Sequence, residues 1–289
     1  EVDLVLGNEE KLTAGNYTVG HNKTQRVGDI MSKTVMQTKT VEKFDHRVRA
    51  FVQIQQGCDH RCTFCIIPFA RGNSRSIPID QLVLQTRKLV SNGHREIVLT
   101  GVDIASYGKD LPVQSNLGKL VHRILSDVPK LDRLRLSSLD ATEIDPCLEQ
   151  MFVEQSRLMP HLHLSLQSGD DIILKRMKRR HSREDAINLT KRLSKGRPEI
   201  VFGADIIAGF PTETETMFRN TLSLIDECNL TWVHVFPYSQ RPNTPAAKMP
   251  QVQPEARKLR AAEIRAKGEI ALRRFLKNQI GRKQKIDKF

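Results

Sequence analysis

The sequence predicts an α/β protein whose core is a partial (βα)6 TIM-like barrel. Two observations carry this prediction: six strand-like segments alternate with helical segments, and polar motifs come directly after the strands. Regular alternation of strands and helices favours a parallel sheet with helices outside it. Right-handed crossovers wind such a sheet towards a barrel, and the chemistry of barrels lies at the carboxyl ends of their strands.

Six strands are predicted from short apolar or alternating segments. The first is an alternating one, because Val48, Ala50, Val52 and Ile54 share one face. The predicted strands span residues 47–55, 96–100, 131–137, 162–166, 200–207 and 231–236.

Seven helices are predicted from apolar residues at helical spacing. The first carries Ile79, Leu82 and Leu89 on one face and stops at Asn92-Gly93. The predicted helices span residues 78–91, 117–125, 146–155, 170–177, 183–193, 213–227 and 255–277. The last of these is long and basic.

The segments that flank this core have a different character. Residues 2–8 predict a short strand that ends in a turn, and residues 9–12 a helix start. Residues 13–45 are polar and have no sustained periodicity, so we expect a linker with little core of its own. Residues 281–289 look like the start of a further element.

The composition is that of a globular, basic protein. Of its 289 residues, 39% are hydrophobic and 27% charged, which excludes wholesale disorder. The net charge of +13 favours a polyanionic partner, nucleic acid first, although a basic soluble surface has the same composition. Aromatic residues make up only 5%, so extended platforms for base stacking are not expected.

Cysteine usage and hydropathy bear on the compartment. Three of the five cysteines are clustered in a long chain, which does not indicate a disulfide framework and fits a reducing, cytoplasmic compartment. No apolar run approaches the roughly 18 residues of a membrane span, and no signal peptide opens the chain.

The cysteine loop at residues 56–65 carries the chemistry. Cys58, Cys62 and Cys65 have the spacing C-x3-C-x2-C, so three thiolates can hold three irons of a 4Fe–4S cluster and leave the fourth iron open. Clusters used only for electron transfer usually have four cysteine ligands. The spacing is similar to that of radical S-adenosylmethionine (SAM) enzymes, in which SAM chelates the open iron. A zinc site completed by His60 and an inert buried cluster of thiols are the alternatives.

The other candidate site residues follow the remaining strands. Glycines there allow close backbone approach, hydroxyl and amide groups can bind a nucleoside, and an arginine can pair with a carboxylate. Ordinary turns, helix caps and a solvated basic turn are the alternative interpretations. The candidates are Gly101, Asp103, Ser137, Ser165, Gln167, Arg180, Gly209 and Tyr238. Cys147 and Cys228, each isolated in a predicted helix, are interpreted as core residues.

Taken together, the motifs resemble the radical SAM methylthiotransferases. The resemblance rests on residues 57–68, 164–169, 209–215 and 236–239 and covers about residues 45–275. Residues 69–76 most resemble the group that acts on threonylcarbamoyladenosine in tRNA. Sister groups act on isopentenyladenosine in tRNA or on an aspartate of a ribosomal protein.

The resemblance implies a mechanism. Cys58, Cys62 and Cys65 would hold the cluster, Phe64 would pack near the adenine of SAM, and a 5′-deoxyadenosyl radical would attack C2 of the modified adenosine beside the anticodon. A second cluster would deliver the methylated sulfur, and a second SAM the methyl group. The implied partners are the tRNA anticodon stem-loop and an electron donor such as flavodoxin or ferredoxin, with no membrane.

The resemblance also implies domain boundaries. Residues 1–45 would be the tail of an amino-terminal methylthiotransferase domain plus a linker, residues 46–277 the radical SAM core, and residues 278–289 the start of a TRAM-like RNA-binding domain. The family's second cluster needs three further cysteines, and none precedes Cys58. We therefore expect this chain to cleave SAM without completing methylthiolation.

Two alternative functions stay open on the sequence. One is a radical SAM enzyme with a different acceptor, such as isopentenyladenosine or a ribosomal-protein aspartate. The other is a basic RNA-binding protein with a structural zinc and no enzymatic activity. Zinc without inorganic sulfide would favour the latter.

Overall fold

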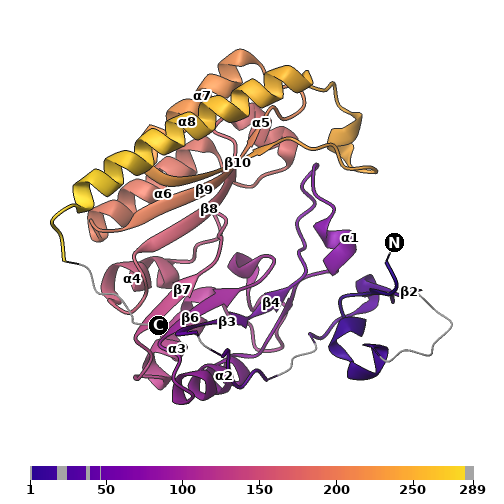
Figure 1. Ribbon diagram of the computed structural model, residues 1–289, viewed down its shortest axis with the longest axis vertical. Coiled ribbons are helices and arrows are strands. Elements are labelled where there is room, and N and C mark those ends of the chain that lie inside the picture. Colours follow the sequence, from indigo (N-terminus) through magenta and orange to yellow (C-terminus); the bar gives the residue numbers. More distant parts are fainter. Residues whose placement is uncertain (1, 18–24, 37–39, 46, 284–289) are drawn as a thin grey trace.

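The computed structural model describes residues 2–17, 25–36, 40–45 and 47–283, and six parallel strands form one curved row in it (Figure 1). In spatial order the strands are β3 (Arg49–Gln53), β6 (Glu96–Thr100), β7 (Arg133–Leu136), β8 (His161–Gln167), β9 (Val201–Ala208) and β10 (Leu230–Pro237). Two three-stranded sheets make up the row, and isolated bridges, Leu134 to Leu158 and Leu139 to Leu164, join them. Within the described residues no strand pairs with the outer edges of β3 and β10. The predicted partial (βα)6 barrel is therefore confirmed.

Helices cover the outer side of the strand row, and α8 lies along β10 (Figure 1). The longer helices are α2 (Ile79–Ser91), α3 (Leu117–Asp127), α4 (Pro146–Glu154), α6 (Arg183–Gly196), α7 (Glu215–Glu227) and α8 (Pro254–Gln279). Two short helices, α1 (Ile67–Arg71) and α5 (Asp171–Met177), follow the cysteine loop and β8. Local sequence starts the helices: at α6, for example, Ser182 and Asp185 form a reciprocal capping box.

Side-chain alternation separates an apolar outer face from a polar inner face. On β8, Leu162, Leu164 and Leu166 are buried against the helices. His161 and His163 alternate with them and point to the other face, which we call the inner face of the row. The outer face therefore holds the core, and the inner face is left for ligands.

The predicted strands and helices all occur, with boundaries that shift by a few residues. The first predicted strand is divided, because β4 (Gln55–Gln56) turns away from β3 to pair antiparallel with β5 (Arg75–Ser76). Sequence periodicity missed α1 and β5, which are too short to show a period. At the carboxyl end, residues 281–283 are neither helix nor strand, and 284–289 lie outside the described residues.

The amino-terminal segment adds little core, as predicted. Its elements are β1 (Val5–Leu6), β2 (Gln25–Arg26) and the 3-10 turns η1 (Glu10–Leu12), η2 (Ala14–Tyr17) and η3 (Ile30–Ser32). Among its described residues only Glu9 is buried. The buried Arg75 fastens the segment, since its guanidinium donates to the Lys33 carbonyl at 3.3 Å and lies 3.5 Å from Oε1 of Glu9.

The described helices include none that is both long enough and apolar enough to cross a membrane.

Two further 3-10 turns, η4 (Ile104–Ser106) and η5 (Pro245–Lys248), follow β6 and β10. They lie in the loops that end at the carboxyl side of the strand row, beside the cysteine loop.

Candidate active site

The three clustered cysteines meet at one cavity. Cys58, Cys62 and Cys65 lie between β4 and α1, at the carboxyl end of the row, and line a cavity of about 350 Å³. Cys147 and Cys228 do not line it. The position is the one that parallel barrels use for chemistry.

The backbone of the cysteine loop is tightly folded against the segment that follows it. Gly57 has φ of +77°, and a Cβ there would come within 1.9 Å of the Asn73 carbonyl oxygen. The Cys58 amide donates to the Gly72 carbonyl at 3.0 Å. Only glycine fits position 57, because both the left-handed φ and the close approach exclude a side chain.

A buried glutamine ties the cysteine loop to the loop after β6. The side chain of Gln55 is fully buried; its Nε2 donates to the Gly57 carbonyl at 2.7 Å and lies 3.0 Å from Ser74 Oγ. Its Oε1 accepts from the amides of Val102 (3.0 Å) and Asp103 (2.8 Å). One amide group therefore sets the distance between the two loops that bound the cavity.

The surroundings of the thiols suit ligands of a metal cluster. Burial, followed by the neighbouring Asp103 carboxylate, raises the pKa of Cys58 to about 12. Cys58 therefore becomes a thiolate only when a cation is present to hold it. Two N–H groups point at the other sulfurs: the Ile67 amide lies 3.4 Å from Cys65 Sγ, and a guanidinium nitrogen of Arg179 lies 3.8 Å from Cys62 Sγ. Such donors stabilise thiolates bound to iron.

His60 lines the cavity and lies beside one of the three cysteines, since the ligand atoms of Cys58, His60 and Asp103 are within 4.8 Å of one another. Its Nε2 lies 3.3 Å from Asp103 Oδ2 and 3.2 Å from Glu143 Oε2. Hydrogen bonds to these two carboxylates raise the pKa of His60 to about 9, so the ring carries a proton. Zinc bound by the three cysteines and His60 would need all four ligand atoms close together, and no group of the described residues within 4.8 Å contains more than one of the three cysteines. This spacing of the ligand atoms disfavours the zinc site that the sequence left open.

Six of the predicted cofactor-binding residues line the same cavity. They are Phe64, Gly101, Asp103, Ser137, Ser165 and Gln167. Gln167 ends β8 with a positive φ of 67°, an uncommon conformation for a residue other than glycine. The strand ends thus bring together side chains that are up to 103 positions apart in the chain, between Phe64 and Gln167.

Gly209 and Tyr238 do not line this cavity. Phe210 lies between the rings of Phe64 (6.3 Å) and Tyr238 (5.5 Å), so Tyr238 reaches the cavity wall only through two other rings. Gly209 has φ of +70°, and a Cβ there would come within 2.3 Å of Arg257 Cγ on α8. The structure thus places both residues behind the lining of the cavity.

The structure places Arg179 at the cavity in place of the predicted Arg180. The Arg180 side chain is 51% exposed and pairs with Glu143 at 2.9 Å, outside the cavity lining. Arg179 is 8% exposed and donates to Asp140 Oδ2 at 2.5 Å and to the Ser165 carbonyl at 2.7 Å. Lys178 ends α5 in the left-handed conformation (φ 58°), and this turn decides which arginine points inward.

Three further polar residues of the lining, Ser138, Asp140 and Asp205, were not among the candidates. Ser138 and Asp140 belong to the polar motif at residues 135–140, whose hydroxyls and carboxylate predict side chains at the mouth of the barrel. Asp205 lies inside a strand that is otherwise apolar, and its isolated charge was a signal for a ligand-facing position.

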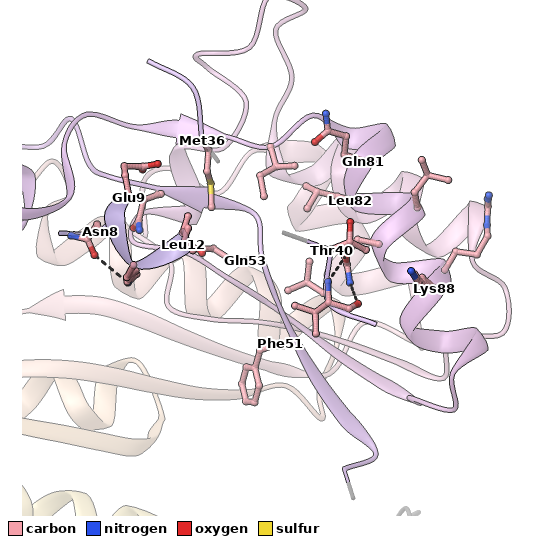
Figure 2. Close-up of a pocket in the computed structure, with 18 of the residues that line it drawn as sticks. Asn8, Glu9, Leu12, Met36, Thr40, Phe51, Gln53, Gln81, Leu82 and Lys88 are labelled. Atoms are coloured by element: carbon pink, nitrogen blue, oxygen red, sulfur yellow. Dashed lines mark hydrogen bonds between the residues drawn. The ribbon is translucent and has the colours of Figure 1, made fainter. Parts of the chain in front are cut away.

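A larger cavity lies elsewhere and contains no cysteine among its lining residues. It has a volume of about 970 Å³ and runs along the open edge of β3, between the amino-terminal segment and α2 (Figure 2). Its wall includes Glu9, Leu12, Phe51 and Leu82. Of these two cavities, only the smaller one at the strand ends is lined by the clustered cysteines.

Comparison with known proteins identifies the class. The model of the radical SAM superfamily matches residues 52–225. Two solved structures share the fold at under 20% identity: the radical SAM methyltransferase TsrM of Kitasatospora setae (TM-score 0.56, 68% of this chain and 38% of that one) and coproporphyrinogen III oxidase HemN of Escherichia coli (TM-score 0.55, 76% and 52%). The chain belongs to the radical SAM superfamily.

Curated relatives narrow this assignment. The threonylcarbamoyladenosine tRNA methylthiotransferase MtaB of Rickettsia prowazekii is 52% identical over 99% of this chain and 68% of that protein. MtaB of Bacillus subtilis is 36% identical over 86% and 56%. The tRNA-2-methylthio-N(6)-dimethylallyladenosine synthase of Roseobacter denitrificans is 39% identical over 75% and 49%. Within the superfamily the chain belongs to the tRNA methylthiotransferases. Among these three it is most similar to the MtaB of Rickettsia prowazekii, and it spans about half to two thirds of their lengths.

Replacing Gln55 by leucine is expected to lower the free energy of unfolding by about 3 kcal/mol, because buried backbone groups of both loops lose their partners. Urea denaturation measures the change. Gln53→Leu is the matched control, since Gln53 is exposed on β3 and makes one long hydrogen bond of 3.5 Å. Equal losses in the two variants would contradict the role assigned to Gln55.

Asp140 is expected to make stability depend on pH at the acid end. Burial favours the neutral acid, but the hydrogen bond with His181 and the charge of Arg179 outweigh it and lower the pKa from 3.8 to about 2. Between these values the unfolded chain binds a proton that the folded chain does not, so stability falls as the pH falls. The stability gap between the wild type and Asp140→Asn should shrink by about 2 kcal/mol from pH 6 to pH 2. Urea titrations that give a constant gap would refute this.

Proposed function

We propose that this chain is the SAM-cleaving core of a tRNA methylthiotransferase that acts at C2 of N6-threonylcarbamoyladenosine beside the anticodon. The observation that carries the proposal is the meeting of Cys58, Cys62 and Cys65 in one cavity at the carboxyl ends of the strands, in a chain 52% identical to an MtaB. Three enzymes that make 2-methylthio-N(6)-dimethylallyladenosine are also relatives, at 32 to 39% identity. The choice of threonylcarbamoyladenosine as the acceptor therefore rests on the higher identity to an MtaB.

The residues of the cavity have two roles: the cysteines would bind the cluster, and the other side chains would contact SAM. Cys58, Cys62 and Cys65 would hold a 4Fe–4S cluster, which with SAM supplies a 5′-deoxyadenosyl radical that removes the hydrogen atom from C2. Polar groups of Ser165 and Gln167 line one side, where they can bind the ribose or carboxylate of SAM. The ring of Phe64 forms an apolar wall, held by Phe210, and suits the adenine.

The sulfur-transfer step needs groups beyond this chain. Its five cysteines include one cluster of three, and the remaining two lie apart in α4 and at the end of α7. We infer that a second cluster is held by a preceding domain and that this chain alone produces 5′-deoxyadenosine without methylthiolation. The electron would come from flavodoxin or ferredoxin in the cytoplasm. The net charge of +13 suits the anticodon stem-loop of tRNA.

Replacing each cavity cysteine by alanine is expected to abolish cluster formation and 5′-deoxyadenosine production, because three ligands are the minimum for this type of site. The chain is reconstituted anaerobically with iron and sulfide, reduced, and assayed for bound iron and for 5′-deoxyadenosine. Cys147→Ala is the matched control, outside the cavity lining, and should retain both. Zinc bound without sulfide in the wild type, or an active Cys62→Ala, would overturn the assignment.

Replacing Arg179 by lysine is expected to slow SAM cleavage by about 100-fold, because a lysine cannot hold Asp140, the Ser165 carbonyl and the Cys62 sulfur at once. Arg180→Lys is the matched control one position away and should retain at least half of the wild-type rate. Initial rates of 5′-deoxyadenosine formation at saturating SAM separate the two. The reverse order of effects would restore Arg180 as the inward-facing arginine.

A further inference from the structure

A row of imidazoles lies on the inner face of the strands, next to the cofactor cavity. His161 and His163 share the inner face of β8 with Ser165, which lines that cavity. On β10, His234 pairs in register with Asp205 of β9, and Asp205 also lines the cavity. The row therefore continues the wall of the cofactor cavity along the inside of the open barrel.

Asp205 fixes two of these rings. Its Oδ1 lies 3.1 Å from His163 Nε2 and 3.4 Å from His234 Nδ1, and the two ring centroids are 4.8 Å apart. This contact places the Nδ1 edge of His234 against the carboxylate. The side chain of His234 is 61% exposed, and its second ring nitrogen, Nε2, is available to a ligand.

A glycine makes the space for this arrangement. A Cβ at Gly203 would come within 2.5 Å of His163 Nδ1 and 3.2 Å of Trp232 Cβ. The φ of Gly203 does not lie in the left-handed region, so the backbone does not require glycine there. What requires it is the ring of His163, which lies over this position.

Positive charge extends the row across β7. The rings of His161 and His163 are 6.3 Å apart, and His161 Nδ1 is buried without a hydrogen-bond partner in the described part of the chain. Burial, followed by the charge of Arg135, lowers the pKa of His161 to about 4. Arg135 and Arg49 both reach Oε1 of Glu96, at 3.0 and 2.7 Å, so two guanidinium groups share one carboxylate oxygen.

We propose that the row of Arg135, His161, His163 and His234 binds the N6 substituent of the substrate adenosine and selects the threonylcarbamoyl group. His234 and Arg135 are the contact residues, and Asp205 and Gly203 are positioning residues. The inference rests on the proposed function, since it deepens the choice of acceptor.

The chemistry of the substituent suits this wall. A threonylcarbamoyl group carries a carboxylate, a hydroxyl and an N–H, whereas an isopentenyl group has no hydrogen-bonding atom. In adenine, C2 and C6 are both bonded to N1, so a base whose C2 faces the cofactor cavity directs its N6 substituent to a neighbouring part of the wall. A wall of polar groups penalises a ligand that leaves them unpaired.

The test measures selectivity by the full 289-residue chain, reconstituted anaerobically and supplied with SAM. Fluorescence anisotropy gives the Kd for anticodon stem-loops that carry threonylcarbamoyladenosine, isopentenyladenosine or adenosine. His234→Phe keeps the ring and removes its nitrogens, Arg135→Gln removes the charge, and Gly203→Ala displaces His163. His122→Phe, on the exposed face of α3, is the matched control. Circular dichroism and cluster absorbance verify that each variant is folded and loaded.

The wild type and His122→Phe should bind the threonylcarbamoyl stem-loop at least ten-fold more tightly than the other two. His234→Phe and Arg135→Gln should each reduce this preference about ten-fold, and Gly203→Ala should reduce it in the same direction. An unchanged preference in all three folded variants overturns the inference and leaves the tRNA function intact. No binding of any stem-loop by the wild type overturns the tRNA function itself. If the wild type binds a divalent metal ion stoichiometrically and only His234→Phe loses it, the row is a metal site, and this result also overturns the inference.

Discussion

The buried amide of Gln55 is the interaction on which the cofactor site depends. This side chain bonds to backbone groups of the cysteine loop and of the loop after β6 at the same time, so it joins two loops that are separate in the chain. It has no contact with water, so each lost bond would leave an unpaired buried group. Gln55 thus sets the distance between the cysteine loop, which carries the thiols, and the loop after β6, which carries Asp103.

The second constraint is the alternation of side chains along the strands. Leucines on the outer face are buried under the helices, while the inner face carries histidines, arginines and hydroxyls beside the cavity. A closed eight-stranded barrel would fill its interior with apolar side chains. Here the row ends at β3 and β10, and the open interior tolerates a polar wall that a large substrate can reach.

The sequence predicted the fold and the centre of the site, and missed what depends on backbone geometry. The periodicity of apolar residues was sufficient to predict the six strands, and the spacing of the three cysteines was sufficient to predict that they meet at one site. Arg179 and Arg180 are adjacent, identical residues, and only the left-handed turn at Lys178 distinguishes them. Gln55 ends a predicted strand with an ordinary alternating pattern, so the sequence did not indicate that its side chain joins two loops. Asp205 and His234 are 29 positions apart, and only the strand register brings them together.

If three protein thiolates hold the cluster, its fourth iron stays open to SAM. Electron–nuclear double resonance of the reduced chain, with SAM labelled with 15N at its amino group and 17O at its carboxylate, measures this directly. We expect hyperfine coupling from both labels to the cluster. A reduced cluster that shows coupling from neither label would mean that the fourth iron is closed and that SAM does not bind it.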